Sequence, residues 1–185
     1  MEASLLGFTA LTELYNVHPV FVHFPIALLP AALLMYFLGA VFEKPFFSAA
    51  GRACLYMGAA GGVAAVITGL MAEGSFPHGE TVHRLMETHE AVGLAVLGLV
   101  SLVLVWSFFQ SEHRPRFVWP FLAVLGLAVL GAMQTADLGA RMVYIHGAAV
   151  KPVAEARAEA GAPAGLEGSE SEAGGDTHEE GDHTH

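Results

Sequence analysis

Four long stretches of the chain are almost wholly apolar and contain no Asp, Glu, Lys or Arg. They cover residues 17–42, 53–72, 91–110 and 117–136. A helix that crosses the hydrocarbon layer needs about 20 apolar residues, and a charged side chain at its centre costs about 2.5–3.5 kcal/mol on insertion scales. A chain of 185 residues is too short to bury four such helices inside a soluble fold. The pattern therefore predicts an all-α protein, a bundle of four transmembrane helices within a domain of residues 17–150.

The polar connections between these spans predict the topology. Residues 43–52 and 111–116 lie on one side of the membrane, and the loop of residues 73–90 lies on the other side together with both termini. The first side carries Lys44, Arg52, Arg114 and Arg116. The second side offers Arg84 and Arg141 near the spans. Because Lys and Arg in short loops mark the cytoplasmic side, we expect both termini, including the segment of residues 1–16, to be extracytoplasmic.

Composition supports lipid as the solvent and separates a tail from the body. Hydrophobic residues make up 54% of the chain and charged residues only 14%, against roughly 25% charged in a soluble domain. The net charge is −10, and nine of the 18 acidic residues lie in residues 151–185. This segment has no Phe, Tyr or Trp and cannot bury enough apolar surface to offset its ordering entropy. We predict a disordered, acidic, histidine-containing tail that repels nucleic acid.

Histidines gather at one predicted face of the membrane. Seven of the ten precede the tail, and the predicted topology brings six of them to the outer interface: His18, His23, His78, His83, His89 and His146. Ionisable side chains at the rim of a membrane bundle are costly, so each needs a partner or a function. Histidines from separate helix ends at one depth indicate a ligand site, although each of them can also be a hydrogen-bonded structural residue.

The segment leading into the third span offers two faces if residues 80–93 are helical. His83 and Glu87 fall on a polar face with Glu80 and Glu90, which is either a solvated stripe or a carboxylate–histidine metal site. His89 falls on an apolar face, with Gly93 one turn below to leave room for a flat group. That face either presents His89 to the bundle or is plain core packing. The motifs HExxH, CxxC and CxxCH are absent, which excludes covalent haem attachment through CxxCH and a thiolate zinc site.

Three segments resemble an uncharacterised family of bacterial four-helix membrane proteins. Residues 16–29, NVHPVFVHFPIALL, resemble the opening signature of that family, in which a His-Pro pair precedes Val-His-Phe-Pro. Two further segments look similar to it, residues 88–90 and residues 139–147. The resemblance implies a four-helix fold in the bacterial inner membrane and a respiratory or redox neighbourhood, since the family often occurs beside cytochromes and c-type haem domains. It carries over His18, His23, His89 and the segment 139–147.

The leading functional prediction is a b-type haem protein for respiratory electron transfer, with cytochromes or other respiratory subunits as partners. Two neutral imidazoles from different helices would bind the iron. His23 and His89 are the preferred axial pair, and His18 or His146 can replace either one. Two arginines at the same rim are candidates for pairing with the haem propionates: Arg84 and Arg141.

Two alternatives of other classes stay open. The first is a membrane protein that binds or handles copper, zinc or iron, with a wider ligand set: His18, His23, His83, Glu87, His89 and His146. The second is a structural subunit of a larger membrane complex. No GxSxG or GxxxxGK motif is present, so the sequence favours an electron-transfer or binding protein over a hydrolase or transferase.

Overall fold

The structure of the protein, a computed structural model, describes residues 17–73, 79–109, 117–150 and 155. These residues form five helices: α2 (His18–Phe21), α3 (His23–Phe42), α4 (Pro45–Ala72), α5 (Glu80–Phe108) and α6 (Val118–Tyr144). Four segments are long and apolar enough to cross a membrane, the first being α2 and α3 together. The predicted all-α class with four candidate spans is confirmed. The predictions for residues 1–16, for His78 and for the disordered tail concern residues outside the described ranges.

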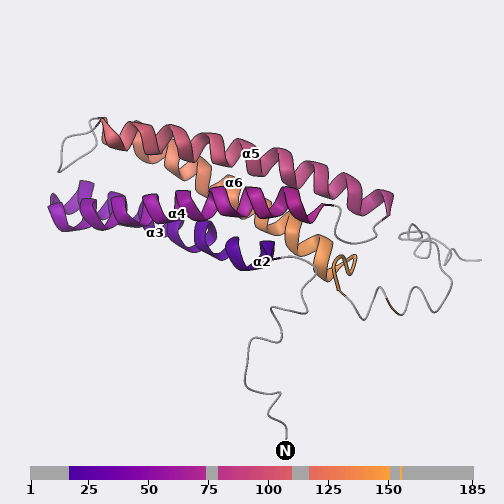
Figure 1. The fold of residues 1–185 in the computed structure, drawn as a ribbon. Helices are drawn as coiled ribbons and strands as arrows, with labels where there is room; N and C mark the ends of the chain where they lie inside the picture. Colours follow the sequence, from indigo (N-terminus) through magenta and orange to yellow (C-terminus); the bar gives the residue numbers. More distant parts are fainter. Residues whose placement is uncertain (1–16, 74–78, 110–116, 151–154, 156–185) are drawn as a thin grey trace, which may run out of the picture.

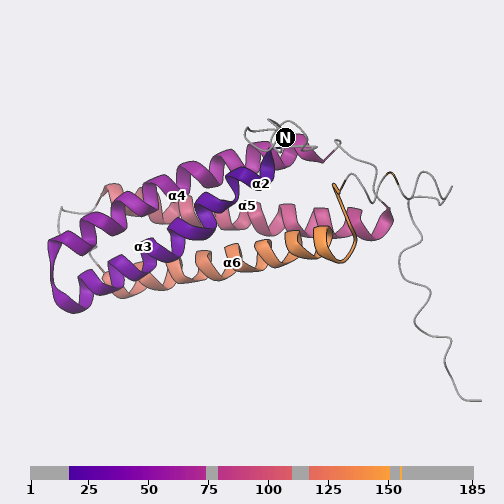
Figure 2. The same cartoon turned by 90° about the horizontal axis from the view of Figure 1, so that it is seen from below.

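The four long helices form an elongated up-and-down bundle (Figure 1). Each has two principal neighbours, since α3 contacts α4 and α6 while α5 contacts the same two helices. The turn between α3 and α4 lies at one end of the bundle, beside the end of α5 and the start of α6. The end of α4, the start of α5 and the end of α6 lie at the other end, near α2 (Figures 1 and 2). Helix ends distant in sequence therefore meet at the α2 end.

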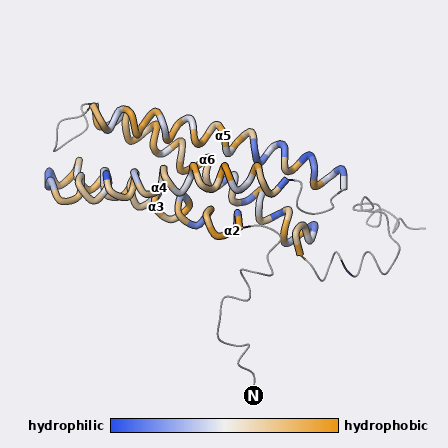
Figure 3. Tube along the Cα trace, in the orientation of Figure 1, coloured by the Kyte–Doolittle hydropathy of each residue, from blue (hydrophilic) through white to orange (hydrophobic). Residues whose placement is uncertain are grey.

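The helices extend beyond the predicted spans. Helix α4 begins at Pro45 rather than at residue 53, α5 begins at Glu80 rather than at 91, and α6 continues past 136 to Tyr144. A predicted span ends at the first charged residue. A helix can continue past that residue, because its backbone hydrogen bonds form within the helix on both sides of it. The expected connection of residues 43–52 shrinks to Glu43, which is left-handed, and Lys44, which is extended and precedes a proline at the start of α4. Figure 3 shows the polar start of α5 and the apolar middle of the bundle.

The core is a narrow column of side chains between the four helices. Its most buried members are Leu29, Ala32, Leu55, Val103, Phe121, Leu125 and Ala128. Large apolar side chains on every long helix are exposed, for example Leu34, Met57, Leu102 and Leu130. Soluble proteins rarely expose so much contiguous apolar surface, and in a bilayer these faces contact lipid chains. The fold thus leaves the polar groups at the helix ends as the candidates for chemistry.

Candidate functional site

Two histidines from different hairpins meet at the α2 end of the bundle. His18 is the first residue of α2, and His89 lies within α5. Their ring centroids are 6.0 Å apart and their planes meet at 80°. Both side chains are half-buried. The fold therefore brings together two imidazoles that are far apart along the chain.

Each imidazole is held by a main-chain carbonyl of the neighbouring helix. His18 Nδ1 donates to the Ala65 oxygen on α4 at 2.9 Å, and His89 Nδ1 donates to the Thr135 oxygen on α6 at 2.9 Å. A carbonyl oxygen only accepts, so Nδ1 carries the hydrogen in both rings. When the rings are neutral, Nε2 then carries the lone pair. Metal-ligating histidines commonly show this arrangement, with the second nitrogen bonded to a carbonyl that fixes the tautomer and the ring orientation.

Glycines let both rings lie against the helix that holds them. A Cβ added to Gly69 on α4 would lie 3.2 Å from His18 Nδ1, and one added to Gly139 on α6 would lie 3.5 Å from His89 Cε1. Gly93, by contrast, faces the neighbouring helix, since its added Cβ would lie 3.8 Å from Thr135 Cγ2. In the structure Gly93 therefore contributes to the contact between α5 and α6.

The ring beside His89 is that of His18 and not that of His23, the partner predicted from the sequence. The two residues are five apart, so on a helix they point in directions about 140° apart. The His18 ring lies against α4, and His23 begins α3 with an exposed side chain. Pro25 has no N–H with which to bond the Phe21 carbonyl, and the helix is interrupted at Val22, between the two histidines.

The polar face predicted for the start of α5 is present and solvated. Residues 80–93 are helical, which is the condition under which the sequence predicts the two faces. His83 Nε2 lies 3.6 Å from a Glu87 carboxylate oxygen, one turn away, with side chains that are 45% and 65% exposed. His146 lies in the turn that ends α6, where its backbone N–H donates to the Arg141 carbonyl. Within the part of the chain that the structure describes, no three His, Cys, Asp or Glu side chains gather as a metal site. The six-residue metal set is therefore not assembled there.

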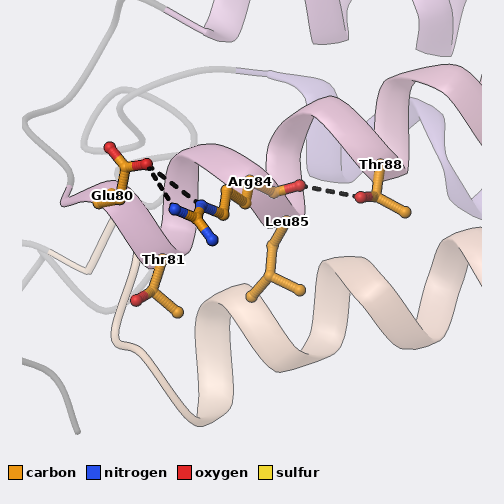
Figure 4. A pocket seen from close by; sticks show the side chains of 5 residues that line it. All are labelled: Glu80, Thr81, Arg84, Leu85 and Thr88. Carbon is orange, nitrogen blue, oxygen red and sulfur yellow. Dashed lines mark hydrogen bonds and ion pairs between the residues drawn. The ribbon is translucent and has the colours of Figure 1, made fainter.

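The two candidate propionate partners are engaged in exposed ion pairs. Arg84 contacts Glu80 at 3.1 Å, and Arg141 contacts Asp137 at 2.7 Å. Arg84 and Glu80 also line a surface pocket on the first turns of α5, together with Thr81, Leu85 and Thr88 (Figure 4). No histidine lines this pocket. Exposed pairs contribute at most about 1 kcal/mol, so both guanidinium groups can exchange their partners at little cost.

The comparisons with known proteins agree with this architecture. The family model that matches is described as "Predicted membrane protein (DUF2231)", and the match covers residues 15–152, which include all five helices and both members of the histidine pair. Searches of curated proteins and of solved structures found no match. Because the match extends over most of the chain and over every described helix, the protein belongs to the DUF2231 family of predicted membrane proteins.

Proposed function

We propose that the protein is a b-type haem protein of the bacterial inner membrane, in which His18 and His89 would hold the haem iron, with electron transfer as its role. The observation that supports this most strongly is the 6.0 Å between the two ring centroids. Two imidazoles that hold one ion between their Nε2 atoms have ring centres about 6 Å apart, since each metal–nitrogen bond is about 2 Å and the ring centre lies about 1 Å behind its nitrogen.

The number of ligands favours haem over a structural zinc site. A porphyrin supplies four nitrogens to its iron, so the protein needs to supply only two axial ligands. Structural zinc sites take four protein ligands, and catalytic ones take three. The pair provides two, and among the described residues no third His, Cys, Asp or Glu joins it in a metal-holding group. A two-histidine site at a half-buried helix junction is suited to haem.

The chain's own residues would orient and tune such a group. Bound haem supplies a one-electron couple between ferric and ferrous iron. The carbonyls of Ala65 and Thr135 engage Nδ1 of each ring, which leaves Nε2 as the nitrogen that would bind the iron. Partial burial limits water at the pair, and burial together with hydrogen bonds to the ligands sets the potential of a haem protein. Arg84 and Arg141 remain the candidates for the propionates.

Charge at the two ends of the bundle supports an orientation. The end opposite the pair carries Lys44, and Arg114 and Arg116 lie in the sequence between α5 and α6, so we assign this end to the cytoplasm. The pair then lies at the outer face, and both termini are extracytoplasmic. Redox partners would be cytochromes or other respiratory subunits that approach this face, while lipid covers the exposed apolar sides of the helices.

A copper site is the second candidate, because the same spacing suits a two-coordinate ion. Imidazole is a good ligand for copper, zinc and iron, and a linear monovalent copper needs only two ligands.

The full chain, purified in detergent after expression with haem and copper available, should show an intense Soret band and about one haem per chain. Metal analysis is the matched measurement. Stoichiometric copper without porphyrin absorbance would favour the copper site over haem. A protein that contains neither haem nor copper would contradict both proposals.

A further inference from the structure

The bundle consists of two equivalent hairpins, α2–α3 with α4 and α5 with α6. Buried positions of α3 recur in α5 at a constant offset of 71 residues: Leu29 and Val100, Ala32 and Val103, Tyr36 and Ser107. Buried positions of α4 recur in α6 at an offset of 70: Gly51 and Phe121, Leu55 and Leu125, Gly58 and Ala128, Ala59 and Val129. The two halves therefore bury the same faces of corresponding helices.

Equivalent residues touch each other at two levels of the bundle. His18 and His89 are 71 positions apart and have neighbouring rings. Tyr36 Oη and Ser107 Oγ are also 71 positions apart, and they lie 3.3 Å from each other. Two equivalent residues meet only near a twofold axis, so an approximate twofold axis runs along the bundle and passes both pairs. Parallel repeats of this kind, related by an axis along the membrane normal, are known in membrane proteins. The histidine pair lies on the axis.

The two halves hold their histidines in the same way. The accepting carbonyls, Ala65 on α4 and Thr135 on α6, are 70 positions apart. The glycines that lie against the rings, Gly69 and Gly139, follow four residues later in both helices. The site is thus built twice from equivalent parts, and any difference between the halves stands out against this background.

One difference concerns Thr68, because the equivalent position on α6 is Leu138. Thr68 Oγ1 lies 3.4 Å from His18 Nδ1. The hydroxyl has a single hydrogen, which it donates to the Ala64 carbonyl at 2.8 Å or to the Ala65 carbonyl at 3.1 Å. Its lone pairs are left to accept, so Nδ1–H of His18 faces two acceptors, the carbonyl of Ala65 and the hydroxyl of Thr68. Leucine has no such group to offer His89.

We propose that Thr68 is a positioning residue that makes the two imidazoles unequal, with His18 the more strongly donating ligand. This inference rests on the proposed haem function. A second acceptor at Nδ1–H increases the negative charge at Nε2, and a more basic ligand stabilises ferric iron over ferrous iron. Removal of the hydroxyl should then weaken the binding of ferric haem selectively and raise the reduction potential.

The test compares two variants of the full chain. Thr68→Val removes the hydroxyl at nearly constant shape, and Thr68→Ser restores it. Thr68→Ser is therefore the matched control, since it changes the same position and keeps the group that faces His18 Nδ1. We expect Thr68→Val to weaken ferric binding relative to ferrous binding by up to about tenfold, which is about 59 mV for a one-electron couple. Thr68→Ser should keep the wild-type potential.

A measurement without haem separates this inference from the proposed function. In the ¹⁵N-histidine-labelled full chain, the Nδ1 proton of His18 should shift in Thr68→Val and return in Thr68→Ser, whether or not haem is bound. A chain that binds no haem contradicts the proposed function, and the nitrogen spectrum then decides the role of Thr68 alone. An unchanged His18 resonance in Thr68→Val, or an equal shift of the potential in Thr68→Ser, would overturn the inference.

Discussion

Replacement of either His18 or His89 by alanine is expected to abolish stoichiometric haem binding. Each variant removes one of the two histidines proposed to hold the haem iron, so that only one ligand from the protein remains. Loss of an outer-shell partner alone costs about 10–100-fold in metal affinity, so loss of a direct ligand should exceed that range. The haem-to-protein ratio and the low-spin absorption spectrum of the purified full chain measure the effect. Both variants should fold, because neither ring belongs to the buried apolar column.

His23→Ala is the matched control for this experiment. His23 begins α3 with an exposed side chain, five residues from His18. The variant removes an imidazole from the same segment and should keep its haem. If His23→Ala loses haem while His18→Ala retains it, the assigned pair is incorrect, and the pair first suggested by the sequence, His23 with His89, takes its place.

The sequence was sufficient to predict the architecture because the bilayer imposes a simple rule. A charge-free stretch of about 20 residues has few alternatives to a membrane helix, and four such stretches joined by short connections predict an up-and-down bundle. The charge rule cannot predict where the helices end. Arg52 and Glu90 come directly before the second and third predicted spans, yet both lie inside continuous helices. A backbone at the interface keeps its helical hydrogen bonds.

The candidate site could be predicted only in part. The histidines gather at one end because the chain crosses the membrane an even number of times between them, and the four predicted spans imply this number. The choice between His18 and His23 depends on helix rotation, which is set by the interruption at Val22 and by the contact of His18 with α4. The carbonyls of Ala65 and Thr135 could not be predicted, because a main-chain acceptor has no residue signature. The glycines four residues later, Gly69 and Gly139, are the one signal in the sequence.

The internal repeat is hidden in the sequence because the two halves fill one space with different side chains. Tyr36 packs edge-on against Phe121, with centroids 4.8 Å apart. Their equivalents in the other half are Ser107 and Gly51, both small. A Cβ on Gly51 would lie 3.0 Å from the Tyr36 ring. Two large rings from opposite halves thus fill the space beside the axis, and the equivalent positions hold small residues that leave this space open. Cores tolerate such exchanges when the total volume is kept, and they erase sequence similarity.

Gly61→Ala is expected to be the most destabilising single-methyl change in the contact between α3 and α4. The added Cβ would overlap the Phe24 Cβ and lie 3.2 Å from Cγ of the same ring. Both Cβ atoms are fixed to helix backbones, so the helices themselves must move apart. Overpacking typically costs about 1–3 kcal/mol, and each kcal/mol lowers the melting temperature of a domain of this size by about 2–4 °C. Thermal unfolding of the full chain in detergent measures the loss.

Gly62→Ala is the control, since it adds the same methyl group one residue further along α4. There the added Cβ would meet Leu97 at 3.9 Å and Pro25 at 4.0 Å, which are ordinary contacts. Gly131 on α6 is the equivalent of Gly61, and its added Cβ would lie 2.6 Å from Val96 Cγ2. That atom is a side-chain methyl group and not a Cβ attached directly to a helix backbone, so Gly131→Ala should cost less than Gly61→Ala. If all three variants melted at the wild-type temperature, the close helix contacts that place the histidines would not exist in the folded protein.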